Sequence, residues 1–204
     1  MGKILAGVNK SDPAAAVDGR ERGVVRQMLP AGVGPDGVLP AGIYQASIGE
    51  LRAHFGAAAV PAHGDRREMI LDALDLYARM IRAHFSNPTI WVNGGFVTRK
   101  LWAAPDDADV VTLIDPAQAL GNFLDNVKLL VTAVADRLSV TASGGRAIPF
   151  AAGVQMKPMG GLIDAYMGAD LPAIRAYWQR WFSNVRLPDG SISAGDTKGF
   201  VELI

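Results

Sequence analysis

Two glycines and two acidic residues have the residue types and the spacing that binding a phosphate and a metal ion requires. Gly94 and Gly95 follow a short apolar run, and Asp107 and Asp109 stand two residues apart just before a second one. Side chains at i and i+2 of an extended segment point to the same side, so the two carboxylates could share divalent cations through hard oxygen ligands. Paired glycines let a backbone approach a phosphate, and a helix starting at Phe96 would aim free N–H groups at it. A phosphate cradle beside a metal-binding acidic pair is what phosphoryl transfer needs.

This pattern resembles the signature of the nucleotidyltransferase superfamily, in which two small residues and a short spacer precede an acidic–hydrophobic–acidic sequence. The chain is closer still to a small branch of minimal nucleotidyltransferase-like proteins from bacteria and phages. The resemblance spans roughly residues 39–204 and is carried by residues 39–43, 91–100, 107–111 and 198–202. It implies an α/β (α+β) fold, in which a small mixed sheet is flanked by helices.

The resemblance also implies a bound nucleoside triphosphate (NTP) as substrate and two Mg²⁺ ions, or Mn²⁺ in their place. Asp107 and Asp109 match the metal-binding pair of the family. The third carboxylate of the family comes from a later strand, and Asp164, within the apolar run 162–167, fits that position. It would bind one metal and help deprotonate the attacking hydroxyl, which needs a base within hydrogen-bond reach.

Gly94 and Gly95 would hold the β- and γ-phosphates in this resemblance, with Thr98 and Lys100 as helpers. The sequence departs from the family at Gly95, because the second small residue is usually a serine whose hydroxyl contacts the phosphate. Loss of a hydrogen bond to a charged group costs on the order of 1.5–3 kcal/mol, so weaker NTP binding or loss of activity is expected from this departure.

The function that follows is metal-dependent transfer of a nucleoside monophosphate from an NTP to a hydroxyl. RNA, a protein side chain or a small molecule would serve equally as acceptor. By analogy with related families, the setting is toxin–antitoxin or phage defence, with an antitoxin or a second copy of the chain as partner. One alternative is an inactive or weak nucleotide-binding or protein-interaction module of the same fold. Another is a structural, phage-associated protein.

The surrounding sequence predicts the elements that position these residues. Ser47 and Glu50 fit a capping box that opens a helix to about Phe55. Apolar spacing indicates a second helix over 66–85. Short strands are predicted at 89–92, 110–114, 162–167 and 199–204, and further helices at 115–138 and 170–182, with strand or loop at 147–157 and a Gly-rich loop at 143–145. Helices and strands alternate, as in a mixed α/β body.

Composition narrows the alternatives. Lys and Arg number 20 and so do Asp and Glu, so the chain lacks the basic excess of a protein that coats nucleic acid. It contains no cysteine, which excludes disulfides, thiolate zinc sites and thiol catalysis. Its histidines show no metal-ligand spacing. Arg66 and Arg67 are best explained as a solvated helix start, whereas Lys198 could equally serve the site or support the last strand.

Residues 1–38 are predicted to form an irregular extension, because the first 42 residues contain 8 Gly and 4 Pro without a repeat. One helical turn is expected at 24–29. Residues 39–204 are predicted to form the nucleotidyltransferase-like domain. The start of the chain lacks a signal-peptide core and no apolar run is long enough to span a bilayer, so we expect a cytoplasmic protein with no membrane partner.

Overall fold

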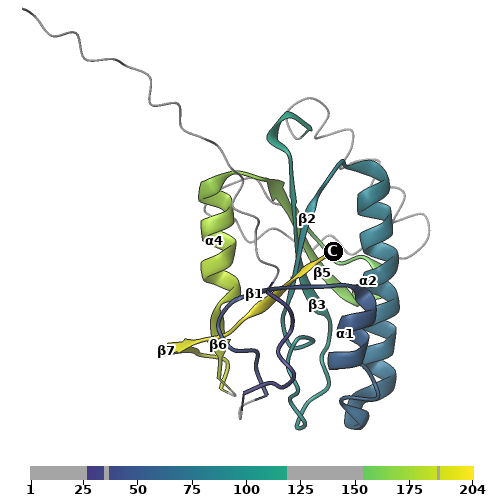
Figure 1. Cartoon of the computed structure of the whole chain (residues 1–204), viewed down its shortest axis with the longest axis vertical. Coiled ribbons are helices and arrows are strands. Elements are labelled where there is room, and N and C mark those ends of the chain that lie inside the picture. Colours follow the sequence, from purple (N-terminus) through teal and green to yellow (C-terminus); the bar gives the residue numbers. More distant parts are fainter. Residues whose placement is uncertain (1–26, 35–36, 119–153, 188) are drawn as a thin grey trace, which may run out of the picture.

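The computed structural model describes residues 27–34, 37–118, 154–187 and 189–204 (Figure 1). The helical turn expected at 24–29 is absent from residues 27–29, and its residues 24–26 lie outside the described residues. The Gly-rich loop expected at 143–145 also lies outside the described residues. So does most of the helix expected over 115–138, of which only residues 116–118 are described and helical.

Six strands form one mixed sheet, in the order β1-β8-β2-β3-β5-β4. β1 runs parallel to β8 and β3 runs parallel to β5, while the other neighbours are antiparallel. The strands are β1 (Ile43–Ala46), β2 (Thr89–Asn93), β3 (Ala108–Ile114), β4 (Val154–Met156), β5 (Ile163–Ala169) and β8 (Phe200–Leu203). β6 (Asn184–Arg186) and β7 (Ile192–Thr197) form a separate two-stranded sheet.

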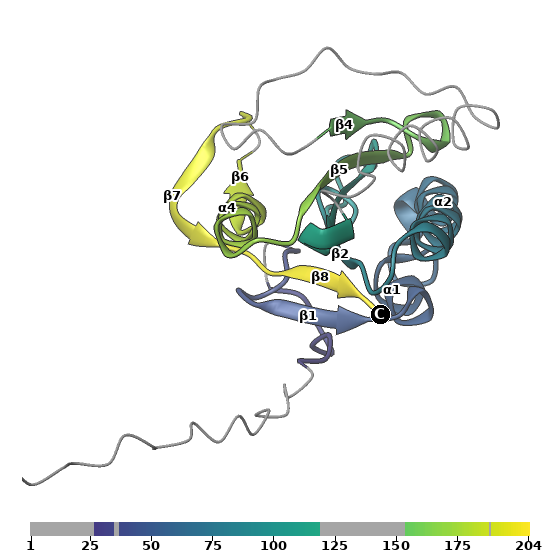
Figure 2. The same cartoon turned by 90° about the horizontal axis from the view of Figure 1, so that it is seen from above.

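Helices cover both faces of the large sheet, as Figure 2 shows from above. α1 (Ile48–Phe55) and α2 (Gly64–His84) lie on one side, and α4 (Pro172–Phe182) lies on the other. Short 3-10 turns, η1 (Pro61–His63) and η2 (Met159–Gly161), precede α2 and β5. The mixed α+β architecture predicted from the sequence is therefore present.

The first two helices form where the sequence predicts them. The capping box of α1 is complete, since the Glu50 backbone N–H donates to Ser47 Oγ at 3.3 Å and the Ser47 N–H donates to Glu50 Oε2 at 2.7 Å. Each bond satisfies a donor that a helix start leaves without a partner. α2 buries its apolar stripe, including Ile70, Leu74 and Ile81, against the sheet.

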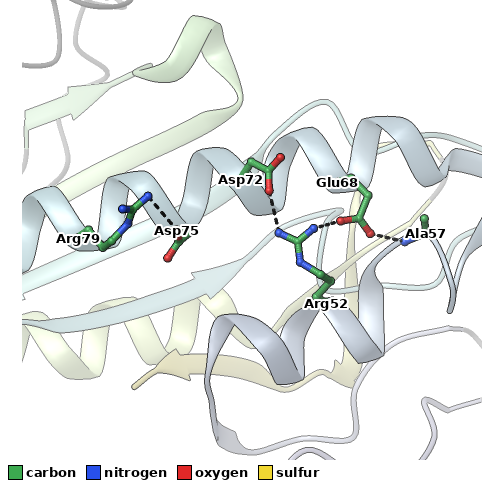
Figure 3. A network of polar contacts seen from close by, with 6 residues as sticks. All are labelled: Arg52, Ala57, Glu68, Asp72, Asp75 and Arg79. Atoms are coloured by element: carbon green, nitrogen blue, oxygen red, sulfur yellow. Dashed lines mark hydrogen bonds and ion pairs between the residues drawn. The ribbon is translucent and has the colours of Figure 1, made fainter.

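Charged residues join α1 to α2 on the outer surface (Figure 3). Arg52 of α1 pairs with Glu68 and, at 2.7 Å, with Asp72 of α2. The Ala57 backbone N–H donates to Glu68 Oε1 at 2.8 Å. This network links the two helices on their solvent side.

Aromatic side chains fill the opposite face of the sheet. Trp178 and Phe182 of α4 pack with Trp91 and Phe200 of the neighbouring strands β2 and β8. Ring centroids lie 5.1 Å apart for Trp91 and Phe200 and 5.6 Å apart for Phe182 and Phe200, in the range of tilted and edge-to-face pairs. This contact holds the end of α4, and the β6–β7 hairpin after it, close to the start of β8.

The helix expected to start at Phe96 is absent, and this prediction was wrong. Residues 94–97 form a bend and a turn, and Thr98 pairs with Val38 in an isolated bridge. Phe96 and Val97 are buried, so the chain turns these apolar side chains into the core instead of continuing as a helix. Arg67 holds the turn by donating to Phe96 O at 2.8 Å and to Thr98 O at 2.6 Å.

Two further features differ from the sequence prediction. Strand β1 was not expected, and it forms because β8 offers a parallel partner along its full length. Arg67 was expected to be solvated, yet its side chain is fully buried.

Among the helices that the structure describes, none combines the length and the apolar character needed to cross a bilayer.

Candidate active site at one end of the sheet

Parallel pairing brings two of the predicted acidic residues side by side. β3 and β5 start at the same end of the sheet, and Asp109 is the register partner of Asp164 across this pair. Neighbouring strands lie about 4.8 Å apart, and residues in register have side chains on the same face. Asp107 immediately precedes β3, so all three acidic residues gather at this end, which is the lower end in Figure 1.

A lysine that the sequence did not indicate links two of these carboxylates. Lys157 Nζ lies 3.2 Å from Asp107 Oδ2 and 3.9 Å from Asp164 Oδ2. The Tyr166 hydroxyl also donates to Asp164 Oδ2, at 3.2 Å. Asp107 and Asp164 therefore converge on one cationic atom, although one precedes β3 and the other lies in β5. No sequence motif marks Lys157, because only the antiparallel turn into β5 places it here.

Asp109 lies against the glycine bend. A Cβ atom on Gly94 would overlap Asp109 Oδ2, and the Gly94 φ of +84° lies in the left-handed region that favours glycine. Burial and, to a lesser extent, the charges of Asp107 and Asp164 raise the pKa of Asp109 to about 6, although Lys198 and Arg186 oppose the rise. The glycine thus makes room for a carboxylate that is held in a poorly solvated, acidic environment.

Asp107 is affected in the same direction. Burial raises its pKa, and the hydrogen bond and charge of Lys157 counteract part of this rise. Asp164 itself is only 9% exposed. Three carboxylates crowded in one half-buried place are a strained arrangement unless positive charge compensates them.

Basic residues lie on the other side of Asp109. Lys198 precedes β8, its backbone N–H donates to Ser183 O at 2.9 Å, and only 9% of its surface is exposed. Burial, together with the neighbouring cations Lys100 and Arg186, lowers the pKa of Lys198 to about 8, although Asp109 counteracts part of this shift. The sequence left the role of Lys198 open and gave no sign of Arg186.

The remaining predicted residues occupy different surroundings. Gly95 is exposed beside Gly94, and its carbonyl accepts a hydrogen bond of 2.7 Å from Thr98 Oγ1. Thr98 is buried, so its hydroxyl serves the turn and does not face the carboxylates. Lys100 is partly exposed, with its ammonium 5.8 Å from the centre of the Trp102 ring and near enough to Lys198 to affect its pKa.

The donor set at this end is rich in carboxylate oxygens, which are the ligands that Mg²⁺ and Mn²⁺ favour. As the side chains stand, no three His, Cys, Asp or Glu residues in the described ranges form a ready metal-binding group. The Lys157 ammonium occupies the space between Asp107 and Asp164. The arrangement can neutralise a cation on its acidic side and an anion on its basic side.

Comparison with known proteins assigns the chain to a family. A model described as a family of unknown function, DUF6932, matches residues 32–204, which is most of the chain. The chain belongs to DUF6932. No curated protein and no solved structure matches it.

The match to DUF6932 covers every residue of the site. Of the positions selected from sequence, the structure brings together Asp107, Asp109, Asp164 and Gly94, with Gly95 beside them. Thr98 is turned into the protein interior, and Lys100 reaches the basic side of the site. The residues that the sequence analysis did not select come from segments that follow the acidic motif along the chain: Lys157, Tyr166 and Arg186.

Proposed function

We propose that this DUF6932 protein transfers a nucleoside monophosphate from an NTP to a hydroxyl, with divalent metal held by Asp107, Asp109 and Asp164. The observation that carries the proposal is the convergence of three carboxylates, from β5 and from the start of β3 and the residue before it, beside a glycine bend. The nucleotidyltransferase signature in the sequence supports the same assignment. We accordingly infer a nucleotidyltransferase-like fold for residues 39–204.

The carboxylates suit Mg²⁺ or Mn²⁺ in their chemistry. All are hard oxygen donors, and the raised pKa of Asp109 reflects its burial first and then its acidic neighbours Asp107 and Asp164. That Asp107 and Asp164 both reach Lys157 Nζ supports a cation position between them. When bound, two such ions would neutralise the triphosphate and polarise its phosphorus–oxygen bonds.

The residues of the chain supply the remaining functions. Gly94 gives the Asp109 carboxylate its space, and the exposed backbone of Gly95 is available to a phosphate. Asp164 would accept the proton of the attacking hydroxyl. The hydrogen bond from Tyr166 at 3.2 Å orients that carboxylate.

A labelling experiment tests the proposal. The protein is incubated with each of the four α-labelled NTPs, Mg²⁺ or Mn²⁺, and a cell extract as source of acceptors. We expect labelled product from the wild-type chain and a loss of at least about 100-fold in Asp109→Asn and Asp164→Asn, because these remove metal ligands. Asp106→Asn is the matched control, since Asp106 is an exposed neighbour outside the cluster.

Two outcomes decide the matter. Labelling that survives in both cluster variants would contradict the assigned roles, and no labelling with any nucleotide would count against transfer altogether. Digestion of a labelled product with ribonuclease or protease then distinguishes an RNA, protein or small-molecule acceptor. A labelled antitoxin-like partner or a labelled second copy of the chain would place the reaction in a toxin–antitoxin or self-modifying setting.

A second candidate is a nucleotide-binding module without turnover, and glycine at position 95 favours it. A Cβ at Gly95 would meet only Pro105, at 3.8 Å, so a serine fits here without rearrangement. Gly95→Ser would supply the hydroxyl that the family usually has, and we expect it to tighten Mg-NTP binding by about tenfold or more. Calorimetry measures this affinity. Tight binding without product in both forms would favour the binding module.

A further inference from the structure

Most arginines in the described part of the chain have partners, but one buried lysine there does not. Arg52, Arg79 and Arg175 form ion pairs, and the fully buried Arg67 donates to three backbone carbonyls. Among the described residues, the ammonium of Lys198 has neither a hydrogen bond nor an ion pair, although only 9% of the residue is exposed. An unpaired buried cation is costly, so its retention needs a reason.

The order of the strands, and not proximity along the chain, brings Lys198 to the acidic site. Asn93, the last residue of β2, is the register partner of Asp109, and β8 pairs with the other edge of β2. Lys198 stands just before β8, at that same end of the sheet. Its neighbour Thr197 pairs with Asn184 of β6, which holds the hairpin and Arg186 nearby.

The site therefore has two electrically different halves that share Asp109. On one half, Lys157 compensates Asp107 and Asp164. On the other half, Lys198 has the like charges of Lys100 and Arg186 as neighbours and Asp109 as its acidic neighbour beyond ion-pair distance. The three cations come from separate segments: the loop after β2, the end of β6, and the residue before β8. Like charges gathered around a buried lysine repel one another unless an anion binds between them.

We propose that Lys198, with Lys100 and Arg186, forms an anion subsite for the polyphosphate chain of a nucleotide. The proposal deepens the proposed function, because it assigns residues of this chain to the triphosphate and to the pyrophosphate that leaves. Several cations from separate segments match a chain of linked phosphates better than a single compact anion. A buried lysine that has no partner in the described ranges is available to bind such a ligand without first breaking a bond to them.

The subsite can be tested without metal and without catalysis. Isothermal titration calorimetry in EDTA measures the affinity of the full-length protein for inorganic pyrophosphate, with inorganic phosphate titrated in parallel. We expect pyrophosphate to bind more tightly than phosphate and Lys198→Met to weaken pyrophosphate binding at least tenfold. Lys198→Arg keeps the charge and should stay within about threefold of wild type. Arg180→Met removes an exposed charge from α4 and should leave the affinity unchanged.

The outcomes separate this inference from the proposed function. If Lys198→Met binds pyrophosphate as tightly as the wild type, or if wild type binds none, the subsite is overturned. Lys198-dependent binding by a protein that transfers no nucleotide would support the subsite and contradict transfer. A melting temperature checks that Lys198→Met folds. Should it not, Arg186→Met at an exposed position replaces it, with a loss of at least threefold expected and an unchanged affinity counting against the subsite.

Discussion

Arg67 and Lys198 are both buried cations, but they differ in how far hydrogen-bond partners compensate their charge. Arg67 lies at the start of α2 and donates to Phe55 O, Phe96 O and Thr98 O at 3.1, 2.8 and 2.6 Å. Burial and the nearby charge of Arg99 lower its pKa, yet its carbonyl partners compensate much of the lost hydration. Lys198 has no such partners in the described part of the chain, and Asp109 stabilises it only from a distance.

The difference separates a structural charge from one that is available to a ligand. A planar guanidinium with several donors can hold three chain segments together, which is what Arg67 does for the turn after β2. The Lys198–Asp109 region keeps opposite charges close but not paired, at a cost in stability. Perturbed groups of this kind concentrate at functional sites, where a ligand completes the missing interactions.

The largest expected effect tests the structural role of Arg67. Arg67→Met should lower the free energy of unfolding by about 3–5 kcal/mol, because it leaves buried carbonyls without donors. Urea denaturation measures it. Arg82→Met is the control, since Arg82 makes a single hydrogen bond of 2.9 Å to Leu203 O and should lose only about 1 kcal/mol. A loss below about 1 kcal/mol for Arg67→Met would show that its carbonyl bonds add little.

The next prediction concerns pH and Asp109. The folded-state pKa of Asp109 is about 6 against 3.8 unfolded, so the native state binds more protons between these values and its stability falls as pH rises through them. At pH 7 the cost amounts to about 3 kcal/mol. Asp109→Asn removes this cost and should therefore be more stable than wild type at pH 7 in EDTA, by up to that amount.

The pH profile of this difference provides its own control. Below about pH 3 Asp109 is protonated in both states, so its charge no longer separates the two proteins. Chemical denaturation at several pH values follows the difference in unfolding free energy. A difference that stays constant from pH 4 to pH 7 would mean that the charge of the Asp109 carboxylate is well compensated. The contrast between Arg67 and the Lys198–Asp109 region would then not hold for Asp109.

A smaller effect distinguishes the two glycines of the bend. Gly94→Ala should cost about 1–3 kcal/mol, because its positive φ disfavours a side chain and the methyl group would displace Asp109. Gly95→Ala, next to it in the chain, meets only Pro105 at 3.8 Å and should change stability by less than about 0.5 kcal/mol. Thermal melts of both variants measure this. Equal losses would contradict the close approach of Asp109 to Gly94.

The smallest effects belong to the surface network of Figure 3. Arg79 pairs with Asp75 at 3.1 Å on an exposed face of α2, and Arg79→Ala should cost no more than about 0.5 kcal/mol. Arg52 has two acidic partners and is better placed, so Arg52→Ala should cost about 1 kcal/mol. Raising the salt concentration should reduce both losses, whereas the loss in Arg67→Met should persist.

Local patterns predicted much of the secondary structure. The Ser47–Glu50 capping box, the apolar stripe of α2 and the Pro172 start of α4 each act within a few residues, so the sequence shows them directly. The predicted helix at Phe96 failed for the opposite reason. The core at that point was able to bury Phe96 and Val97, and this burial overrode the local tendency.

The residues of the site also fall into those that a local pattern indicates and those that only the tertiary structure places. Asp107, Asp109 and the glycines lie close together in the chain, and a motif was enough to select them. Lys157, Arg186 and the role of Lys198 depend on strand order, because they reach the site only through the pairing of β3 with β5 and of β2 with β8. No spacing in the sequence encodes that order.

The sequence alone determined which residue types were available: acidic pairs, a glycine bend and helices with one apolar face. Their short spacing makes these features readable, since backbone geometry fixes how close neighbours along the chain can lie. Tertiary structure decided the charges around them. It placed Asp164 in register with Asp109, inserted Lys157 between two carboxylates and buried Lys198 without a partner among the residues that the structure describes. The reason is that burial and charge compensation depend on distances through space, which only the assembled sheet sets.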